Sequence, residues 1–163
     1  MATIAKTGCG KFVFDRYGSH IDIATNVLKD ALFKLQIPQG INYTYTSVRL
    51  PYQAGYNIVV PAEEGEEIFY AKRSGNKFLS RFVVKNPIPT KYVSLELKKL
   101  EKVENEWLLL SSHLGDKRYP EIDLTEGIGP MEEDLAFWNS HAFCWGYAAV
   151  VPGTITQDCP WEP

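Results

Sequence analysis

The stretch from Tyr92 to Gly115 reads YVSLELKKLEKVENEWLLLSSHLG, and it contains the clearest structural pattern in the chain. In its first part Val93, Leu95 and Leu97 alternate with polar residues, a period of two that is typical of a strand with one buried face. The second part, 107–110, is continuously apolar, which predicts a strand covered on both faces. The charged residues between them predict the loop of a β-hairpin.

The second strand of this hairpin brings reactive side chains to its end. Ser111, Ser112 and His113 follow the apolar run and precede Gly115. On a strand Ser111 and His113 share one face, whereas Ser112 points to the other. A hydroxyl and an imidazole at the end of a rigid strand are well placed for chemistry if they open onto solvent. The chain has no GxSxG motif, which makes a serine hydrolase the weaker interpretation of this serine and histidine.

Length and composition indicate a globular protein. The 163 residues are 45% hydrophobic and 23% charged, which predicts one domain over residues 1–163, with 1–18 and 152–163 as its loose ends. No apolar run reaches the roughly 18 residues of a membrane helix, and the first residues lack the apolar centre of a signal peptide. We therefore expect a soluble, cytoplasmic protein. Its three cysteines form no CxxC pair, which favours reduced thiols.

The remaining periodicities predict an α+β fold. Ser19 to Gln36 has the spacing of an amphipathic helix, with Ser19 as its N-cap. Further elements are expected at 41–50 (strand), 56–60 (strand), 67–85 (hairpin), 131–141 (short helix) and 143–151 (buried closing strand). The expected architecture is a twisted, mostly antiparallel sheet with an N-terminal helix and a short C-terminal helix packed on it.

The charges are unevenly distributed along the chain. The net charge is −3, but residues 69–102 carry nine Lys or Arg against two acids, whereas residues 116–163 carry nine acids against two cations. The predicted hairpin contributes a basic face, for which RNA or an acidic protein would be the partner, and its aromatic residues could stack on bases. The face comprises Lys72, Arg73, Lys77 and Lys85, with Tyr70, Phe78 and Phe82 between them. The other interpretation is that the aromatic residues belong to the core and the cations are solvated.

The three histidines are His20, His113 and His141. They show no HExxH or helical i, i+4 spacing, and the sequence predicts neither a metal site nor a cofactor. His20 is expected in the first turn of the helix, where the dipole favours a neutral imidazole. Two histidines and a cation would suffice for RNA cleavage without a metal. The candidate cations are Arg81, Arg49 and Lys85, and the sequence does not choose among them.

The last third of the chain resembles an uncharacterised bacterial protein family. The resemblance lies in a strand ending in a hydroxyl residue, then x-x-x-Gly, a PE-containing loop, and FWxxHA before an apolar run. The matching residues are Ser111, Gly115, Pro120, Glu121, Phe137, Trp138, His141 and Ala142. The chain departs from the family where Ile122 follows Glu121 in place of Pro–Trp–Asp. This resemblance implies no particular activity.

The order of elements is similar to that of the barnase, colicin and RelE-type ribonuclease toxins. The shared order is a helix with a histidine, basic strands, and a hairpin whose last strand ends in a hydroxyl residue and glycine. The resemblance implies that His20 is an acid or base, that Arg81 is the cation, and that Ser111 contacts the phosphate. The acidic isoelectric point, about 5.6, and the extra C-terminal third are departures from those toxins.

Three functions remain open from the sequence. The favoured one is a non-catalytic binding module that uses the basic hairpin face. The alternative is a metal-independent ribonuclease-like enzyme in which His20, Arg81, Ser111, His113 and His141 supply the site. The third is a structural subunit that associates through the apolar segment 143–151.

Overall fold

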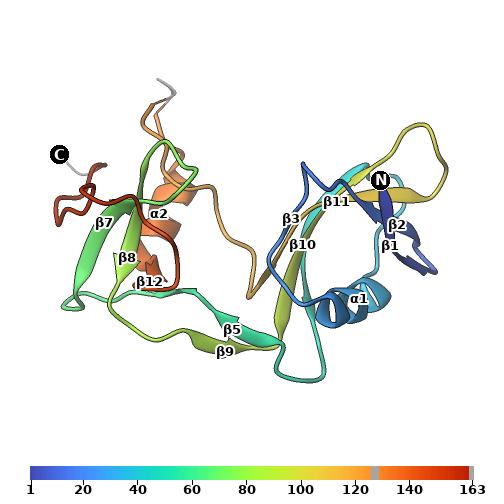
Figure 1. Cartoon of the computed structure of the whole chain (residues 1–163), viewed down its shortest axis with the longest axis horizontal. Helices are drawn as coiled ribbons and strands as arrows, with labels where there is room; N and C mark the ends of the chain where they lie inside the picture. Colours follow the sequence, from blue (N-terminus) through green and yellow to red (C-terminus); the bar gives the residue numbers. More distant parts are fainter. Residues whose placement is uncertain (126–128, 162–163) are drawn as a thin grey trace. The chain divides into compact units, whose positions relative to one another are not determined.

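The computed structural model describes residues 1–125 and 129–161, and the chain divides into two compact units. Unit 1 comprises Met1–Tyr56 and Pro89–Lys117, and unit 2 comprises Asn57–Ile88 and Arg118–Pro163. Each unit has a hydrophobic core made only of its own residues. Figure 1 identifies the elements of both units.

Unit 1 is built on one sheet with the strand order β1-β2-β11-β10-β4. The strands are β1 (Ala2–Thr7), β2 (Gly10–Phe14), β4 (Tyr43–Arg49), β10 (Tyr92–Lys99) and β11 (Glu106–Leu114). The short strand β3 (His20–Ile21) continues beside β11 where β2 stops. β2 and β3 run parallel to β11, and the other pairs are antiparallel. Pairing of β1 with β2 orders most of the segment 1–18 that was expected to be a loose end.

The predicted hairpin of β10 and β11 is confirmed, but β11 is not covered on both faces throughout. Val93, Leu95 and Leu97 are fully buried, as the alternation predicts. In β11 only every second apolar side chain is buried: Leu109 is inaccessible, whereas the residues on either side of it, 108 and 110, are half-exposed. A β-bulge lies here, because Glu96 pairs with Ser111 while Leu97 pairs with Leu109. The continuous apolar run therefore reflects a bulge as well as burial.

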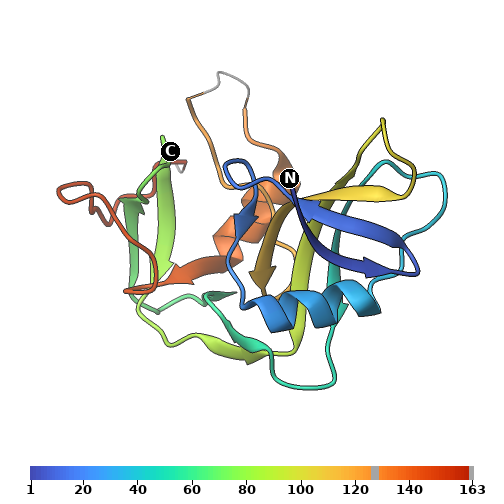
Figure 2. The same cartoon turned by 45° about the vertical axis from the view of Figure 1, so that its right-hand side comes forward.

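Helix α1 (Thr25–Lys34) covers one face of this sheet, as Figure 2 shows. Its buried residues, Val27, Leu28, Ala31 and Leu32, have helical spacing and join the core cluster that contains Leu95. The face of the sheet opposite α1 is consequently free to carry polar side chains.

The predicted start of α1 at Ser19 is wrong, and so is the placement of His20 in its first turn. The Ser19 hydroxyl donates to the Leu109 carbonyl at 2.5 Å and accepts the Asp15 amide at 2.9 Å, so it cannot cap a helix. His20 is extended because it pairs with β11. The helix begins at Thr25 after Ala24, without a side-chain cap. His20 therefore does not lie at a helix N-terminus.

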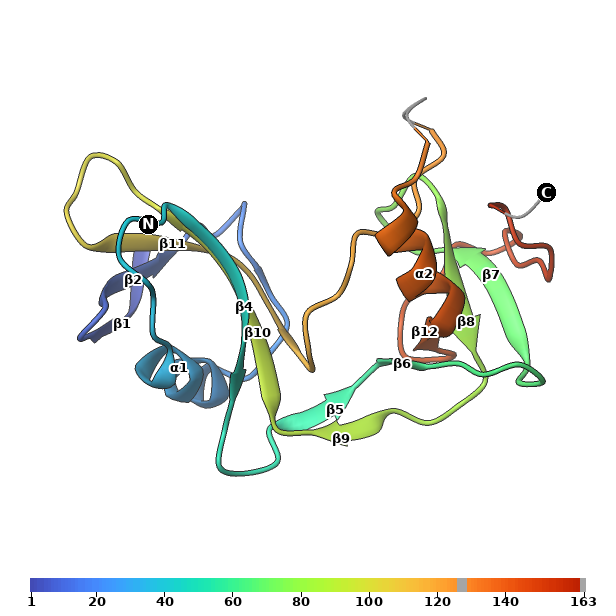
Figure 3. The same ribbon diagram turned by 180° about the vertical axis from the view of Figure 1, so that it is seen from behind.

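Unit 2 contains a four-stranded sheet with the order β6-β12-β8-β7. Its strands are β6 (Val59–Pro61), β7 (Ile68–Lys72), β8 (Leu79–Val83) and β12 (His141–Cys144). Helix α2 (Glu132–Ser140) leads directly into β12, as Figure 3 shows. The predicted hairpin and short helix are thereby confirmed. The expected closing strand at 143–151 is shorter and begins earlier, because the chain turns after Cys144 and reaches a positive φ at Gly146.

The predicted strand 56–60 is divided between two sheets. β5 (Gly55–Asn57) pairs with β9 (Ile88–Thr90), and β6 pairs with β12. The division follows Asn57, whose side-chain oxygen accepts the Val59 amide at 3.0 Å in a local turn. At the other end of the chain, Trp161 donates to the Asn139 side chain at 2.9 Å. That contact holds the predicted loose end 152–163 as far as residue 161; residues 162–163 lie outside the described part.

The described residues form two helices and twelve mostly antiparallel strands, which confirms the predicted α+β class with its N-terminal and short C-terminal helices. The strands are distributed over three sheets rather than one. Within this described part, neither helix is long and apolar enough to cross a membrane.

Candidate functional site

The face of the unit 1 sheet that lies opposite α1 carries tyrosine, serine, histidine, glutamate and basic side chains. We call it the polar face. Its members follow from the strand register and from the hydrogen bonds among them. They are Tyr43, Tyr45, Ser47 and Arg49 on β4; Tyr92, Ser94, Glu96 and Lys98 on β10; Ser111 and His113 on β11; and His20 on β3.

Four of these residues form one row across four neighbouring strands. His20 pairs with Ser111, Ser111 with Glu96, and Glu96 with Tyr45. We call this the central row. His20 and Glu96 are two strand spacings apart, which corresponds to about 9–10 Å between their Cα atoms. His20 is exposed and the other three are half-buried, so the row is accessible from solvent.

Glu96 is held by two hydroxyl donors. The Ser111 hydroxyl donates to Glu96 Oε1 at 3.0 Å, and the Tyr43 hydroxyl donates to Glu96 Oε2. The hydrogen bond to Glu96 is the main reason that the pKa of Tyr43 is raised to about 12, with smaller contributions from burial and from the Glu96 charge. The two hydroxyl donors thus fix the orientation of the carboxylate.

His113 lies one step along the strand from Ser111 and is held more tightly. Its Nδ1 is 3.2 Å from the Leu114 carbonyl oxygen, which can only accept, so Nδ1 carries the hydrogen. In the neutral ring Nε2 then accepts the Tyr45 hydroxyl at 2.7 Å. The residue is 9% exposed. This geometry is better suited to orienting Tyr45 than to direct contact with a substrate.

Three of the five predicted catalytic residues, His20, Ser111 and His113, therefore lie on one face of one sheet. The other two, Arg81 and His141, belong to unit 2. The His141 ring stacks on Phe137 with a centroid distance of 4.2 Å, and its Nδ1 lies 3.1 Å from the Phe137 carbonyl oxygen. His141 therefore has local partners at the end of α2.

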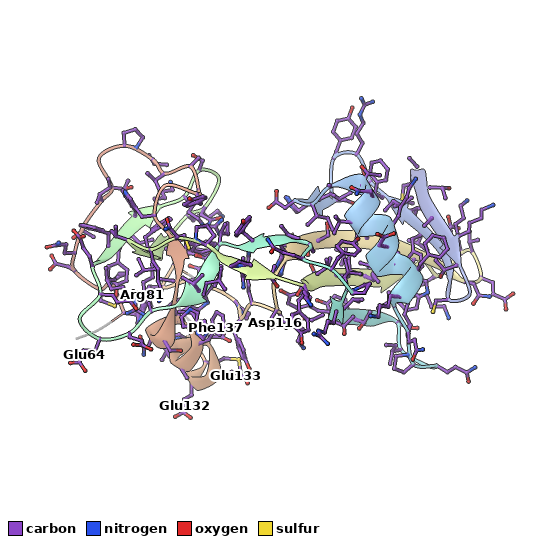
Figure 4. All side chains as sticks on the ribbon, turned by 90° about the horizontal axis from the view of Figure 1, so that it is seen from below. Glu64, Arg81, Asp116, Glu132, Glu133 and Phe137 are labelled. Carbon is purple, nitrogen blue, oxygen red and sulfur yellow. The ribbon has the colours of Figure 1, made fainter. Side chains whose placement is uncertain are left out.

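Arg81 is also engaged within unit 2. Its guanidinium donates to the Trp138 carbonyl at 2.9 Å and lies 3.4 Å from the His141 carbonyl oxygen. These carbonyls lie at the end of α2, where a helix leaves acceptors without partners. Figure 4 labels Arg81 in unit 2, together with the exposed Glu132 and Glu133 of α2. The contacts of Arg81 are those of a side chain that holds the helix end.

The basic hairpin of unit 2 meets acidic residues of its own unit. The Arg73 guanidinium forms an ion pair with Glu121 and lies 4.4 Å from the centroid of the Phe143 ring. Lys85 pairs with Glu66 at 3.2 Å. Lys72 is half-buried and Lys77 is exposed. Half of the predicted binding cations are therefore already paired.

The aromatic residues of that hairpin are mostly internal. Tyr70 is 6% exposed and Phe82 is inaccessible, while Phe78 is half-buried. Tyr70 and Phe82 are thus core aromatics, as the second of the two sequence interpretations holds. A base cannot stack on a ring that the protein already covers.

Sequence reasoning missed Glu96, Tyr43 and Tyr45. The alternation of β10 puts Glu96 on the polar side of its strand, and this signal was available. The alternation of β4 instead puts Tyr43 and Tyr45 in line with Ile41 and opposite Thr44, so it predicted a buried side for both tyrosines. The pairing of Glu96 with Ser111 was not available, because it depends on the bulge in the β10–β11 hairpin.

The described part of unit 1 includes three hollows. One of 570 Å³ borders Phe14 and Tyr17, one of 290 Å³ borders Cys9 and Trp107, and one of 630 Å³ lies at the loop between β10 and β11. None of the three is lined by the central row or by His113. Lys98 is the one member of the polar face that borders any of these three hollows, the 630 Å³ one. Among residues 1–125 and 129–161, no group of three or more His, Cys, Asp or Glu is placed to hold a metal ion.

No protein-family model, curated protein or solved structure matches this chain.

Proposed function

We propose that the chain is a metal-independent, ribonuclease-like enzyme whose acid and base lie in the central row of the polar face. The observation that carries this proposal is the row itself: a carboxylate, Glu96, and an exposed imidazole, His20, flank Ser111 on rigid strands of one sheet. An acid and a base on either side of one phosphodiester are the minimum for cleaving RNA without a metal.

The reaction uses the 2′-hydroxyl of the substrate as the nucleophile. Glu96, as a carboxylate, takes the 2′-hydroxyl proton while the 2′-oxygen attacks phosphorus. His20, as an imidazolium, gives its proton to the 5′-oxygen as the P–O5′ bond breaks. The products are a 2′,3′-cyclic phosphate and a 5′-hydroxyl, and both side chains have changed protonation state. One deprotonated and one protonated group together give a bell-shaped dependence of rate on pH.

Other residues of the polar face support these two. The hydroxyls of Ser111 and Tyr43 orient the Glu96 carboxylate, and His113 orients Tyr45. The Lys117 ammonium lies 5.8 Å from the centroid of the Tyr45 ring. A cation beside the central row would stabilise the additional negative charge of the pentacoordinate phosphate.

The non-catalytic binding module remains the competing function. It needs the basic hairpin of unit 2 to be available for RNA or an acidic protein, and the ion pairs of Arg73 and Lys85 reduce its free charge. Reversing the charges of Lys72, Arg73 and Lys77 would abolish association under that function. Under the proposed function, the same change leaves RNA cleavage intact.

The test is RNA cleavage by the pure protein in EDTA, with the termini of the products identified. We expect 2′,3′-cyclic phosphate ends from the wild type. Glu96→Gln and His20→Asn should each lower the cleavage rate by about 10²- to 10⁴-fold, the range for loss of a general acid or base. An RNA with 2′-O-methyl groups should not be cleaved, since it lacks the nucleophile.

Matched controls separate chemistry from folding. Glu104→Gln makes the same charge change at an exposed loop position, and His141→Asn makes the same imidazole change in unit 2. Both should cleave at the wild-type rate, and circular dichroism should show that all variants are folded. Absence of cleavage by folded wild-type protein, or equal activity of Glu96→Gln and Glu104→Gln, would overturn the proposal.

A further inference from the structure

The polar face continues beyond the central row in both directions along the strands. At one end Tyr92 of β10 lies directly opposite Arg49 of β4. At the other end Tyr43 of β4 lies directly opposite Lys98 of β10. Each end thus presents one tyrosine and one cation side by side. All four side chains are exposed, with 52% of Tyr43 and 37% of Tyr92 accessible to solvent.

A tyrosine next to a cation matches the chemistry of a single nucleotide. The ring offers a surface on which a base stacks, and the cation pairs with the phosphate. Stacking requires a base whose face is not already covered by its neighbours, which favours a single strand over a duplex. The face therefore offers two nucleotide-sized contacts, one on each side of the proposed acid and base.

The distance between the two contacts indicates how long the ligand must be. Tyr43 and Arg49 stand at opposite ends of β4, six residues apart, which corresponds to about 20 Å along the strand. A dinucleotide centred on the central row is too short to reach both ends. An extended strand of several nucleotides would cross the row and contact both pairs.

We propose that the polar face binds extended single-stranded RNA across the central row, with Tyr92 and Arg49 contacting the nucleotides on one side and Tyr43 and Lys98 those on the other. This inference rests on the proposed function, because it assigns the substrate of the same site. The charge of the face agrees with it, since its two cations, Arg49 and Lys98, outnumber its one carboxylate, Glu96.

Binding can be measured separately from cleavage. Fluorescence anisotropy with labelled 2′-O-methyl oligonucleotides, from a dinucleotide to an octanucleotide, reports affinity for a strand that cannot be cleaved. We expect affinity to rise with length until both pairs are occupied and then to level off. Tyr92→Ala should weaken binding of the octanucleotide by about five- to one-hundredfold, the range for losing one stacked base. It should leave dinucleotide binding unchanged.

The cation of the same pair gives a second, independent measurement. Arg49→Ala should reduce the slope of log affinity against log salt by about one, as expected for one lost phosphate contact. The matched controls are Tyr147→Ala, whose ring is 54% exposed in unit 2, and Lys29→Ala on α1. Neither should change the affinity or the slope.

Tyr43 requires a more conservative change, because its hydroxyl also donates to Glu96. Tyr43→Phe keeps the ring, so it should retain octanucleotide binding while cleavage falls. Tyr43→Ala should lose both.

The outcomes separate the two proposals. Affinity that is independent of length and unaffected by Tyr92→Ala and Arg49→Ala would overturn the binding inference, even if cleavage depends on Glu96. Length-dependent binding that these variants weaken, without any cleavage of unmodified RNA, would support the binding inference and overturn the proposed chemistry. Loss of binding in the Tyr147→Ala and Lys29→Ala controls would also overturn the inference, because it would show that the contacts are not confined to the polar face.

Discussion

The two units use the same kinds of residues in opposite ways. In unit 1 the sheet keeps its apolar side chains against α1 and carries Glu, His, Tyr and Ser on a solvent-accessible face. In unit 2 several of the cations are held by protein acceptors. Arg73 meets Glu121, Glu121 also accepts from the buried Ser80, and Arg81 donates to the end of α2.

The difference shows which charged residues are available for function. A cation whose donors are already used by protein acceptors contributes to stability, and releasing it for a ligand costs those bonds. On the polar face the His20 imidazole is exposed, and Glu96 stays half-accessible while the Ser111 and Tyr43 hydroxyls orient it. The surplus of positive charge over residues 69–102 was therefore a weaker guide to the candidate site than the alternation of apolar and polar residues in β10.

The largest expected effects distinguish the two cores. Leu95→Ala in unit 1 should lower the free energy of unfolding by about 2–5 kcal/mol, and Phe82→Ala in unit 2 by about 3–5 kcal/mol. Because the core clusters share no residue, we expect each change to affect its own unit. Fluorine NMR of 5-fluorotryptophan reports both units, since Trp107 lies in unit 1 and Trp138, Trp145 and Trp161 lie in unit 2.

The same experiment tests the single domain expected from chain length. If all four tryptophan signals report the same new unfolding midpoint in either variant, the two units unfold together. The comparison between the units then has no thermodynamic meaning. If Trp107 alone responds to Leu95→Ala, each unit is its own folding unit.

A smaller loss of unfolding free energy is expected when either of two ion pairs in unit 2 is broken, and the loss should differ between them. Arg73→Ala removes a guanidinium that contacts Glu121, Ser80 and the Phe143 ring. It should cost about 2–3 kcal/mol in urea unfolding, because a largely buried carboxylate loses its partner. Lys85→Ala breaks a pair in which both side chains are more exposed, and it should cost less than about 1 kcal/mol. Equal losses of unfolding free energy in the two variants would show that the contacts of Arg73 stabilise the fold no more than a surface ion pair does.

Much of the fold was predictable because it depends on local patterns. The period of two in β10 and the helical spacing within 19–36 are properties of neighbouring residues. β10 formed where its pattern indicated, and α1 occupies the part of the predicted range from Thr25 to Lys34. The start of α1 was not predictable in this way. Ser19 has the character of an N-cap, but its hydroxyl bonds to Leu109, ninety residues away in the sequence. A tertiary contact overrode a local preference.

The candidate site was predicted only in part, for a related reason. The sequence singled out the end of β11, and the structure places His20 on the same face as Ser111, as a strand residue and not as a helix residue. Glu96 was missed because its pairing with Ser111 depends on one extra residue at the bulge. A one-residue change of register alters which side chains are neighbours, and no periodicity reveals it.

The smallest effect tests the hydrogen bond that orients the proposed base. Glu96 raises the pKa of Tyr43 to about 12, so at about pH 11 this tyrosine stays mostly protonated while an ordinary tyrosine is about nine-tenths ionised. Because the native pKa lies above the unfolded one, the bond stabilises the fold below about pH 10 and its contribution is lost as pH rises from there toward 12.

Glu96→Ala should return the pKa of Tyr43 toward its ordinary value of about 10, since the acceptor and its charge are both removed. The measurement is the ¹³Cζ chemical shift of Tyr43 between about pH 9 and 11, a range in which the wild-type signal should barely move. Glu104→Ala is the control, because it removes an exposed carboxylate that has no contact with Tyr43. If the Tyr43 shift follows the same curve in wild type and Glu96→Ala, the hydroxyl does not hold the carboxylate. The polar face of unit 1 would then lack the fixed geometry that distinguishes it from the paired charges of unit 2.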